Sequence, residues 1–140
     1  MSGIQPQVVR DDASAAFYDA AARGELLVKQ GPSGIVLPPD ARTDPASGST
    51  DLTPYVASGL GTLISWAVVH RAPLPALADA VPYVSAIVEL AEGPWLAVRL
   101  IVEDPAVLRA GVAVRATFVR TGGDTPETTG EVVPVFELAD

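Results

Sequence analysis

Residues 59–94, GLGTLISWAVVHRAPLPALADAVPYVSAIVELAEGP, decide the fold of this chain. Two runs rich in β-branched and aromatic residues, 61–71 and 83–90, flank a loop of mainly Pro and Ala, and a Glu-Gly-Pro turn follows the second run. Runs of this kind that are bounded by Gly and Pro are typical of β-strands joined by turns. The stretch therefore predicts two consecutive strands.

More strands are expected on both sides of this stretch. The expected strands are Tyr55–Ser58 leading into Gly61–Arg71, then Tyr83–Leu90, Trp95–Val102, Val112–Arg120 and Glu131–Leu138. Asp104–Gly111 starts with Asp-Pro and ends with Gly, which predicts one helical turn, and Thr121–Gly130 predicts a flexible hairpin loop. Five β-runs in about 85 residues favour a small closed or partly open barrel, because closure removes exposed strand edges and a sandwich usually has more strands.

The chain before the barrel predicts a helix. Residues 1–11 are expected to form a flexible tail, and Asp12 or Ser14 to begin a helix that ends near Arg23. Phe17 falls on the same helical face as small residues, so we expect it to dock the helix onto its neighbours.

A hairpin is expected after the helix. Leu26–Lys29 and Ile35–Leu37 flank the turn sequence Gly-Pro-Ser-Gly, and a polar stretch with Pro and Gly breaks follows. The chain is therefore divided into a tail (1–11), a helix and hairpin segment (12–53) and a barrel domain (54–140).

Composition narrows the classes of partner. The 140 residues carry a net charge of −8 with one lysine and no cysteine, and 49% are hydrophobic. A chain of this size and hydrophobicity can bury one core. Clustered cations that bind nucleic acid or an anionic membrane are missing. No apolar run is long enough to span a bilayer, and the N-terminus lacks the apolar centre of a signal peptide. We therefore expect a cytoplasmic protein with no disulfide and no thiolate metal site.

Several motifs together resemble a known family. They are Phe17-Tyr18, Gly24-Glu25-Leu26-Leu27, Pro38-Pro39, Ser58–Thr62, Ser65–Pro73, Val81–Val84, Val88–Leu90 and Glu92–Pro94. In combination they resemble the DUF35 family of OB-fold proteins that are associated with acyl-CoA enzymes, over about residues 17–136. The resemblance implies a mainly β fold: a five-stranded OB-fold barrel preceded by an N-terminal helix and a rubredoxin-like zinc ribbon.

The chain departs from the family at the zinc ligands. Where the resemblance implies four cysteines, this sequence has Gln30, Ser33, Asp44 and Ser47. Gln and Ser are poor ligands beside thiolate, and a structural zinc site needs four closed nitrogen or sulfur donors. We therefore expect a degenerate, metal-free ribbon. Its segment 30–49 is expected to be a proline-stiffened loop that is ordered by packing or by a partner, or else mobile.

One histidine and two tryptophans are candidate functional residues. His70 is the only histidine, so it is the only side chain that titrates near neutral pH without help. It is either a general base or a strand-end histidine bonded to the following loop, and no Asp or Ser at motif spacing favours the first. Alternation places it on the face of Ile64, Trp66 and Val68. Trp66 and Trp95 are core or interface anchors, or else ligand platforms.

Two arginines are candidates for anion binding. Arg71 and Arg99 lie within or at the end of apolar runs of an acidic chain. The planar guanidinium fork suits the phosphates of coenzyme A. The alternative is an ion pair with Asp79, Glu89 or Glu103.

Two surface features have simpler interpretations. The carboxylates near turns, Glu89, Glu92, Glu103 and Asp104, are expected to form a solvated rim rather than an acid–base pair. Ala76–Val81, with Leu74, forms a mildly apolar loop that marks a partner surface if it is exposed.

The family resemblance implies a function for the chain. Members are typically non-catalytic partners of thiolase-superfamily proteins, including thiolases, lipid-transfer-protein-like aldolases of steroid side-chain breakdown and acyltransferase complexes. By that resemblance this chain is an accessory subunit that helps to form an acyl-CoA channel and binds no cofactor tightly. Trp66, His70 and Tyr83 would contribute to the interface or pocket. The alternatives are a stand-alone hydratase or hydrolase that uses His70, and a lone acyl-CoA or lipid-binding domain.

Overall fold

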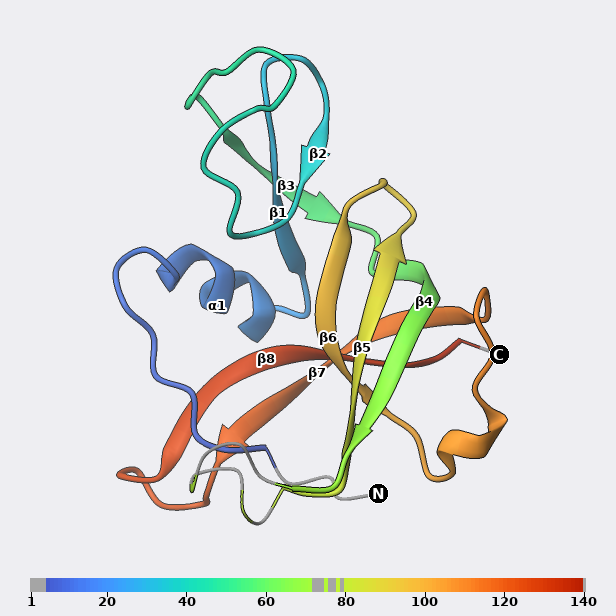
Figure 1. Ribbon diagram of the computed structural model, residues 1–140. Coiled ribbons are helices and arrows are strands. Elements are labelled where there is room, and N and C mark those ends of the chain that lie inside the picture. The colour runs from blue at the N-terminus through green and yellow to red at the C-terminus, as the bar shows by residue number, and fades with distance from the viewer. Residues whose placement is uncertain (1–4, 72–74, 76–77, 79, 140) are drawn as a thin grey trace.

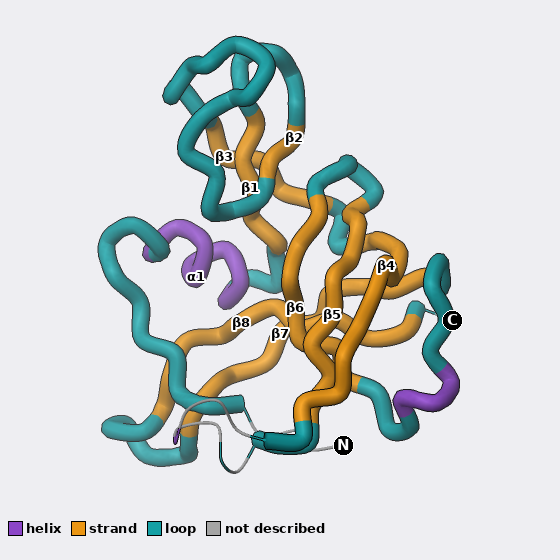
Figure 2. The backbone as a smooth tube through the Cα atoms, viewed as in Figure 1, coloured by secondary structure: helices purple, strands orange, loops and turns teal. Residues whose placement is uncertain are grey.

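In the part of the chain that the structure describes, two β units are accompanied by one α-helix (Figure 1). The computed structural model describes all residues except 1–4, 72–74, 76–77, 79 and 140. One unit is a closed five-stranded barrel and the other is a small three-stranded sheet. The tube view shows the sheet projecting from one end of the barrel, with the helix beside it (Figure 2). The predicted mainly β class and the five-stranded barrel are confirmed.

The barrel consists of the last five strands. These are β4 (Leu60–Val69), β5 (Tyr83–Leu90), β6 (Trp95–Ile101), β7 (Ala113–Gly122) and β8 (Thr129–Leu138). Their order is β4-β5-β6-β8-β7, and β7 returns to β4 to close the barrel. All neighbours are antiparallel except β6 and β8, which are parallel and pair only at Leu100↔Phe136 and Ile101↔Glu137. A five-stranded, partly open barrel is the architecture of an OB-fold.

Alternation along the strands fills the barrel interior. On β5 the side chains of Val84, Ala86, Val88 and Leu90 are buried, and those between them are partly or fully exposed. The fully buried core includes Leu63, Leu100, Val114 and Phe136. Successive residues of a strand point to opposite faces, so this pattern follows directly from the sequence. Each buried aliphatic or aromatic side chain contributes about 1.5–3 kcal/mol.

A β-bulge in β4 changes which residues share a face. Leu63 pairs with Val88, but Ser65 pairs with the preceding residue Ile87, so Ile64 is the extra residue. Directly paired residues project on the same side of a sheet. Leu63, rather than Ile64, therefore shares the face of Trp66, and the expected alternation through Ile64 is wrong because a bulge shifts the phase by one residue.

The small sheet is formed by β1 (Leu26–Gln30), β2 (Val36–Leu37) and β3 (Thr53–Ala57), in the order β2-β1-β3. The predicted hairpin of β1 and β2 is confirmed. β3, expected to lead into the barrel, instead pairs with β1 along five residues. Gly59 then takes φ +81 and turns the chain into β4, a conformation that glycine adopts without strain.

Helix α1 (Ala15–Ala22) packs against β8 and β1. It begins after Ser14 and ends before Gly24, close to the predicted bounds. The Ser14 hydroxyl bonds to Asp11 and makes no hydrogen bond to a helix amide. Phe17 packs on the core, as expected. In the described part of the chain, no helix has the length and apolar character needed to cross a membrane.

The N-terminal segment is tied to the barrel. Val8 O accepts the Glu131 N–H at 2.8 Å, and Val8 N donates to Thr121 Oγ1 at 3.0 Å. Arg10 forms ion pairs with Asp19 at 2.7 Å and with Glu131 at 2.8 Å. Residues 5–11 are therefore not the loose tail that the sequence predicts. Their partners on the barrel, Thr121 and Glu131, lie more than 100 residues away in the chain, so no local pattern indicates them.

Two connections between barrel strands, a helical turn and a hairpin loop, are of the types that the sequence predicts. The turn after β6 is a short 3-10 helix, η2 (Pro105–Val107), and Asp104 Oδ1 accepts the Ala106 N–H at 3.0 Å. β7 and β8 are joined by residues 123–128.

Candidate functional site

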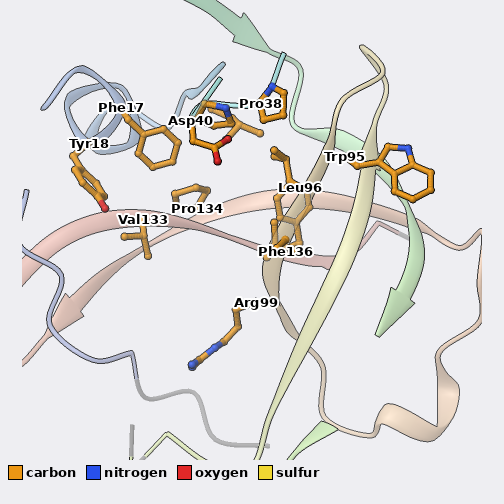
Figure 3. A pocket seen from close by; sticks show the side chains of 14 residues that line it. Phe17, Tyr18, Pro38, Asp40, Trp95, Leu96, Arg99, Val133, Pro134 and Phe136 are labelled. Carbon is orange, nitrogen blue, oxygen red and sulfur yellow. The ribbon is translucent and has the colours of Figure 1, made fainter. Parts of the chain in front are cut away.

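A groove of about 600 Å³ lies between α1, β6, β8 and the loop after β2 (Figure 3). Its walls are mostly apolar. Its principal lining side chains are Phe17, Tyr18, Pro38, Pro39, Asp40, Trp95, Leu96, Arg99, Val133, Pro134 and Phe136. We refer to it below as the seam groove.

The seam groove lies where the barrel closes least completely. β6 pairs with β5 along Trp95–Leu100, but with β8 only at its last two residues. Helix α1 packs on β8 and β1. The part of the β6 edge that does not pair with β8 therefore borders the groove. Pro134 of β8 lies opposite and has no N–H to offer to a neighbouring strand.

Polar groups lie at the borders of the groove. The guanidinium carbon of Arg99 lies 4.2 Å from the centroid of the Tyr83 ring, a cation–π contact. Partial burial lowers the pKa of Arg99 from its ordinary value, and burial likewise raises the pKa of the Tyr18 phenol. In Figure 3 the Arg99 and Trp95 side chains project at separate ends of the site. The arrangement offers an apolar trough with one cation, Arg99, and one carboxylate, Asp40.

The two tryptophans lie on different strands and both are partly exposed. Trp95 begins β6, has 56% of its surface exposed and donates its indole N–H to Glu89 Oε2 at 3.2 Å. Trp66 lies in β4 with 36% exposed and does not line the groove. Neither is a core residue.

The other predicted site residues are only partly brought together. Tyr83 meets Arg99, as described above. His70 and Arg71 follow the end of β4 and are exposed. Among the residues that the structure describes, no side-chain hydrogen bond or ion pair involves either of them. The proposed partner Asp79 and most of the apolar loop around Leu74 lie outside the described residues.

The turn carboxylates act as local hydrogen-bond acceptors. Glu92 Oε2 accepts the Ser58 N–H at 2.7 Å, and Glu89 accepts the indole N–H of Trp95. Asp104 caps η2, as described above, and Glu103 is exposed.

Three of the four degenerate zinc positions meet around one carboxylate. Asp44 is fully buried and accepts hydrogen bonds from Ser33 and from the Ser47 N–H. Gln30 lies outside this cluster and donates its side-chain N–H to Gly34 O at 3.1 Å. The segment is therefore ordered by its own hydrogen bonds.

Sequence reasoning missed part of the groove wall. Tyr18, Asp40 and Pro134 were not chosen as candidate site residues, although Phe17-Tyr18 and Pro38-Pro39 were among the motifs that carried the resemblance. Those two motifs were the features of the sequence that could have indicated this wall of the groove.

Comparison with known proteins gives a consistent result. Residues 54–119 match the family described as ChsH2, C-terminal OB-fold domain. The chain is 33% identical over 116 residues to the 3-oxo-4,17-pregnadiene-20-carboxyl-CoA hydratase alpha subunit of Mycobacterium tuberculosis, covering 83% of this chain and 36% of that protein. It is 32% identical over 136 residues to a probable enoyl-CoA hydratase alpha subunit of Thermomonospora curvata, covering 96% of this chain and 40% of that protein. The chain thus spans less than half the length of these relatives.

A solved structure matches nearly the whole chain. It is described as an Ltp2-ChsH2(DUF35) aldolase, and its superposition has a TM-score of 0.73 at 29% sequence identity. The alignment covers 94% of this chain and 98% of that one.

Proposed function

Because the chain belongs to the DUF35 family and carries an OB-fold domain of the ChsH2 C-terminal type, we propose that it is a non-catalytic subunit of a complex that acts on acyl-CoA thioesters. A thiolase-like partner would carry the catalytic groups. The observation that carries this proposal is the near-complete match to the chain of the Ltp2-ChsH2(DUF35) aldolase structure. The relatives named as CoA hydratase subunits support a CoA thioester as the ligand class.

The seam groove supports a role in forming an acyl-CoA channel. An apolar trough suits the pantetheine arm or the acyl chain, since such sites are mostly apolar with a few placed polar groups. Arg99 is the cation at its border, and a partly desolvated guanidinium forms strong hydrogen bonds with phosphate. Arg71 is exposed at the end of β4 and is a second candidate for the same anion.

The chain's own residues favour a supporting role over catalysis. It has no cysteine, and its single histidine is exposed at the end of a strand. A general base needs hydrogen-bond reach to the proton that it removes, and an orienting partner usually holds it. His70 has no such partner among the described side chains.

The test is co-expression with an Ltp2-like protein, followed by native mass spectrometry and aldolase or thiolase assays. We expect a stable hetero-oligomer whose activity depends on both chains. Turnover of an acyl-CoA by this chain alone, abolished by His70→Ala, would instead establish a stand-alone enzyme. Acyl-CoA binding without turnover and without a partner would indicate a lone binding domain.

Variants of the complex test the ligand assignment. Arg99→Gln is expected to raise the apparent KM for acyl-CoA roughly 10-fold, because it removes a charge-assisted hydrogen bond. Arg115→Gln is the matched control, since Arg115 is exposed on β7 and pairs with Glu137. Equal KM values for the two variants would remove Arg99 from the ligand site. Alanine at Trp66, His70 or Tyr83 tests the predicted interface through the stability of the complex.

A further inference from the structure

The family resemblance implies a structural zinc, and the residues of this chain do not fit one. Its four ligand positions hold Gln30, Ser33, Asp44 and Ser47, which supply one carboxylate and no thiolate or imidazole. A structural zinc site needs four nitrogen or sulfur donors around the ion. Within the described residues, no group of three or more His, Cys, Asp or Glu side chains gathers at any point.

The Asp44 carboxylate is instead bonded through both of its oxygens. Oδ2 accepts the N–H and the hydroxyl of Ser33, at 2.9 and 2.6 Å. Oδ1 accepts the N–H groups of Ala46 and Ser47, at 2.8 and 3.3 Å. The residue is 0% exposed. Hydrogen bonds to an ionised acceptor are about twice as strong as neutral ones, and a buried carboxylate needs them to offset its desolvation.

The backbone around Asp44 is shaped to hold a carboxylate. Gly31 lies so close that a Cβ there would overlap the carboxylate of Asp44. Asp44 N donates to Ser49 O at 2.8 Å, and Gly48 N donates to Asp44 O at 2.7 Å. The carboxylate thus joins the loop after β1 to the loop before β3.

We propose that the Asp44 carboxylate takes the place of the metal as the cross-link of this ribbon, so that the chain folds without zinc. We call this arrangement of Asp44, Ser33, Ala46 and Ser47 the carboxylate clasp. Like the metal of a zinc knuckle, one central group binds two loops, here by accepting hydrogen bonds from Ser33, Ala46 and Ser47. Its donors are backbone N–H groups and one hydroxyl.

The clasp also positions one wall of the seam groove. It fixes Ser33 and Asp44, which are the two ends of the segment that carries Pro38, Pro39 and Asp40. Lys29 Nζ, from β1, also donates a hydrogen bond at 2.9 Å to Ala41 O of this segment. Asp44 is therefore a positioning residue for the groove, although it does not line the groove itself.

Metal content is the first test. The full chain is purified from cells grown with added zinc, and its zinc is measured per chain before and after dialysis against a chelator. We expect less than about 0.1 zinc per chain and an unchanged melting temperature after chelation, since structural zinc contributes folding energy directly. Stoichiometric zinc whose removal lowers the melting temperature would overturn the proposal.

Loss of the clasp is the second test, with Asp44→Asn as the main variant and Asp51→Asn as the matched control on the exposed side of the same loop. Amide hydrogen exchange is followed at Ser33, Ala46 and Ser47 and at barrel amides. We expect Asp44→Asn to speed exchange at the three clasp amides at least 10-fold and to leave barrel amides unchanged. The control should change neither, and equal protection in the two variants would overturn the proposal.

Restoring a metal site is the third test. A variant with Gln30→Cys, Ser33→Cys, Asp44→Cys and Ser47→Cys is titrated with Co²⁺, which reports tetrahedral thiolate ligation by its absorption. We expect one ion per chain and protection of the 31–47 segment only when the metal is bound. If no ion binds, these four positions do not have ribbon geometry and the proposed replacement of a metal is wrong.

Discussion

The barrel of β4–β8 closes around fully buried apolar side chains, whereas the sheet of β1–β3 holds its loops through one buried carboxylate. The buried side chains of the barrel come from all five of its strands, so each one supplies only a part of the stability of the core. The ribbon depends on a few directed hydrogen bonds that meet at Asp44. The strands of the small sheet share the apolar core through Leu26, Val28 and Ala57, but its loops do not, and a carboxylate with enough donors can cross-link such loops.

The largest expected effect comes from breaking the barrel. Phe136 is the largest fully buried side chain among the described residues, and Phe136→Ala is expected to lower the free energy of unfolding by about 3–5 kcal/mol through lost burial and a cavity. Val107→Ala, at a side chain that is 54% exposed, is the control and should stay within about 0.5 kcal/mol. Urea denaturation measures both, and a loss of less than about 1 kcal/mol for Phe136→Ala would mean that the barrel does not depend on this core.

Breaking the ribbon is expected to have a smaller and local effect. Gly31→Ala places a methyl group against the Asp44 carboxylate, and overpacking of this kind costs about 1–3 kcal/mol. Gly34→Ala has open space around its Cβ but a φ of +92, so it should cost about 1 kcal/mol from backbone strain alone.

The two glycine variants are distinguished by amide exchange. Gly31→Ala should raise exchange at Ser33 and Ser47, whereas Gly34→Ala should leave the clasp amides closer to the wild type. Equal exchange in both variants would indicate that the contact between Gly31 and Asp44 does not shape the ribbon.

The same contrast explains what the sequence could predict. The barrel strands follow from period-two alternation, and the helix and hairpin from local start, stop and turn residues, because these signals lie within a few residues of the structure that they specify. The bulge at Ile64 could not be predicted, because one extra residue does not change the pattern of a continuous apolar run.

The clasp and the seam groove depend on contacts between distant residues. Asp44 and Ser33 are 11 residues apart, and the sequence showed Asp44 only as a weak zinc ligand. The hydrogen bonds from Ala46 and Ser47 to Asp44 are a local turn pattern typical of Asp. The sequence could therefore have indicated these two of the four hydrogen bonds of the clasp. The groove arises from incomplete pairing of β6 with β8, which no periodicity reveals.

A third prediction concerns the N-terminal segment, which is fastened to the barrel by directed contacts like those of the ribbon. Arg10→Ala removes the ion pairs with Asp19 and Glu131 and should free the segment without unfolding the barrel, because partly exposed ion pairs at the surface contribute little to global stability. Limited proteolysis should cut the variant before residue 12 faster than the wild type. Arg23→Ala, which removes the exposed pair with Glu25, is the control. Equal cleavage of the two variants would show that Arg10 does not hold the segment.

The smallest expected effect is the response of the ribbon to mild acid. Hydrogen bonds from the Ser33 hydroxyl, and then from the Ser33, Ala46 and Ser47 N–H groups, lower the pKa of Asp44 from 3.8 to about 2. A carboxyl whose pKa is lower in the folded state stabilises the fold fully above the unfolded pKa, and that stabilisation is lost as the pH falls through the folded pKa.

Carboxyl ¹³C shifts should therefore show no titration of Asp44 between pH 7 and pH 4, with a midpoint near 2. A midpoint near 4 would mean that the carboxylate is not held as described. Acid weakens a zinc ribbon as well, but at higher pH, since protons compete with the metal for its ligands. Persistence of the ribbon at pH 4 therefore also separates a carboxylate cross-link from a metal one.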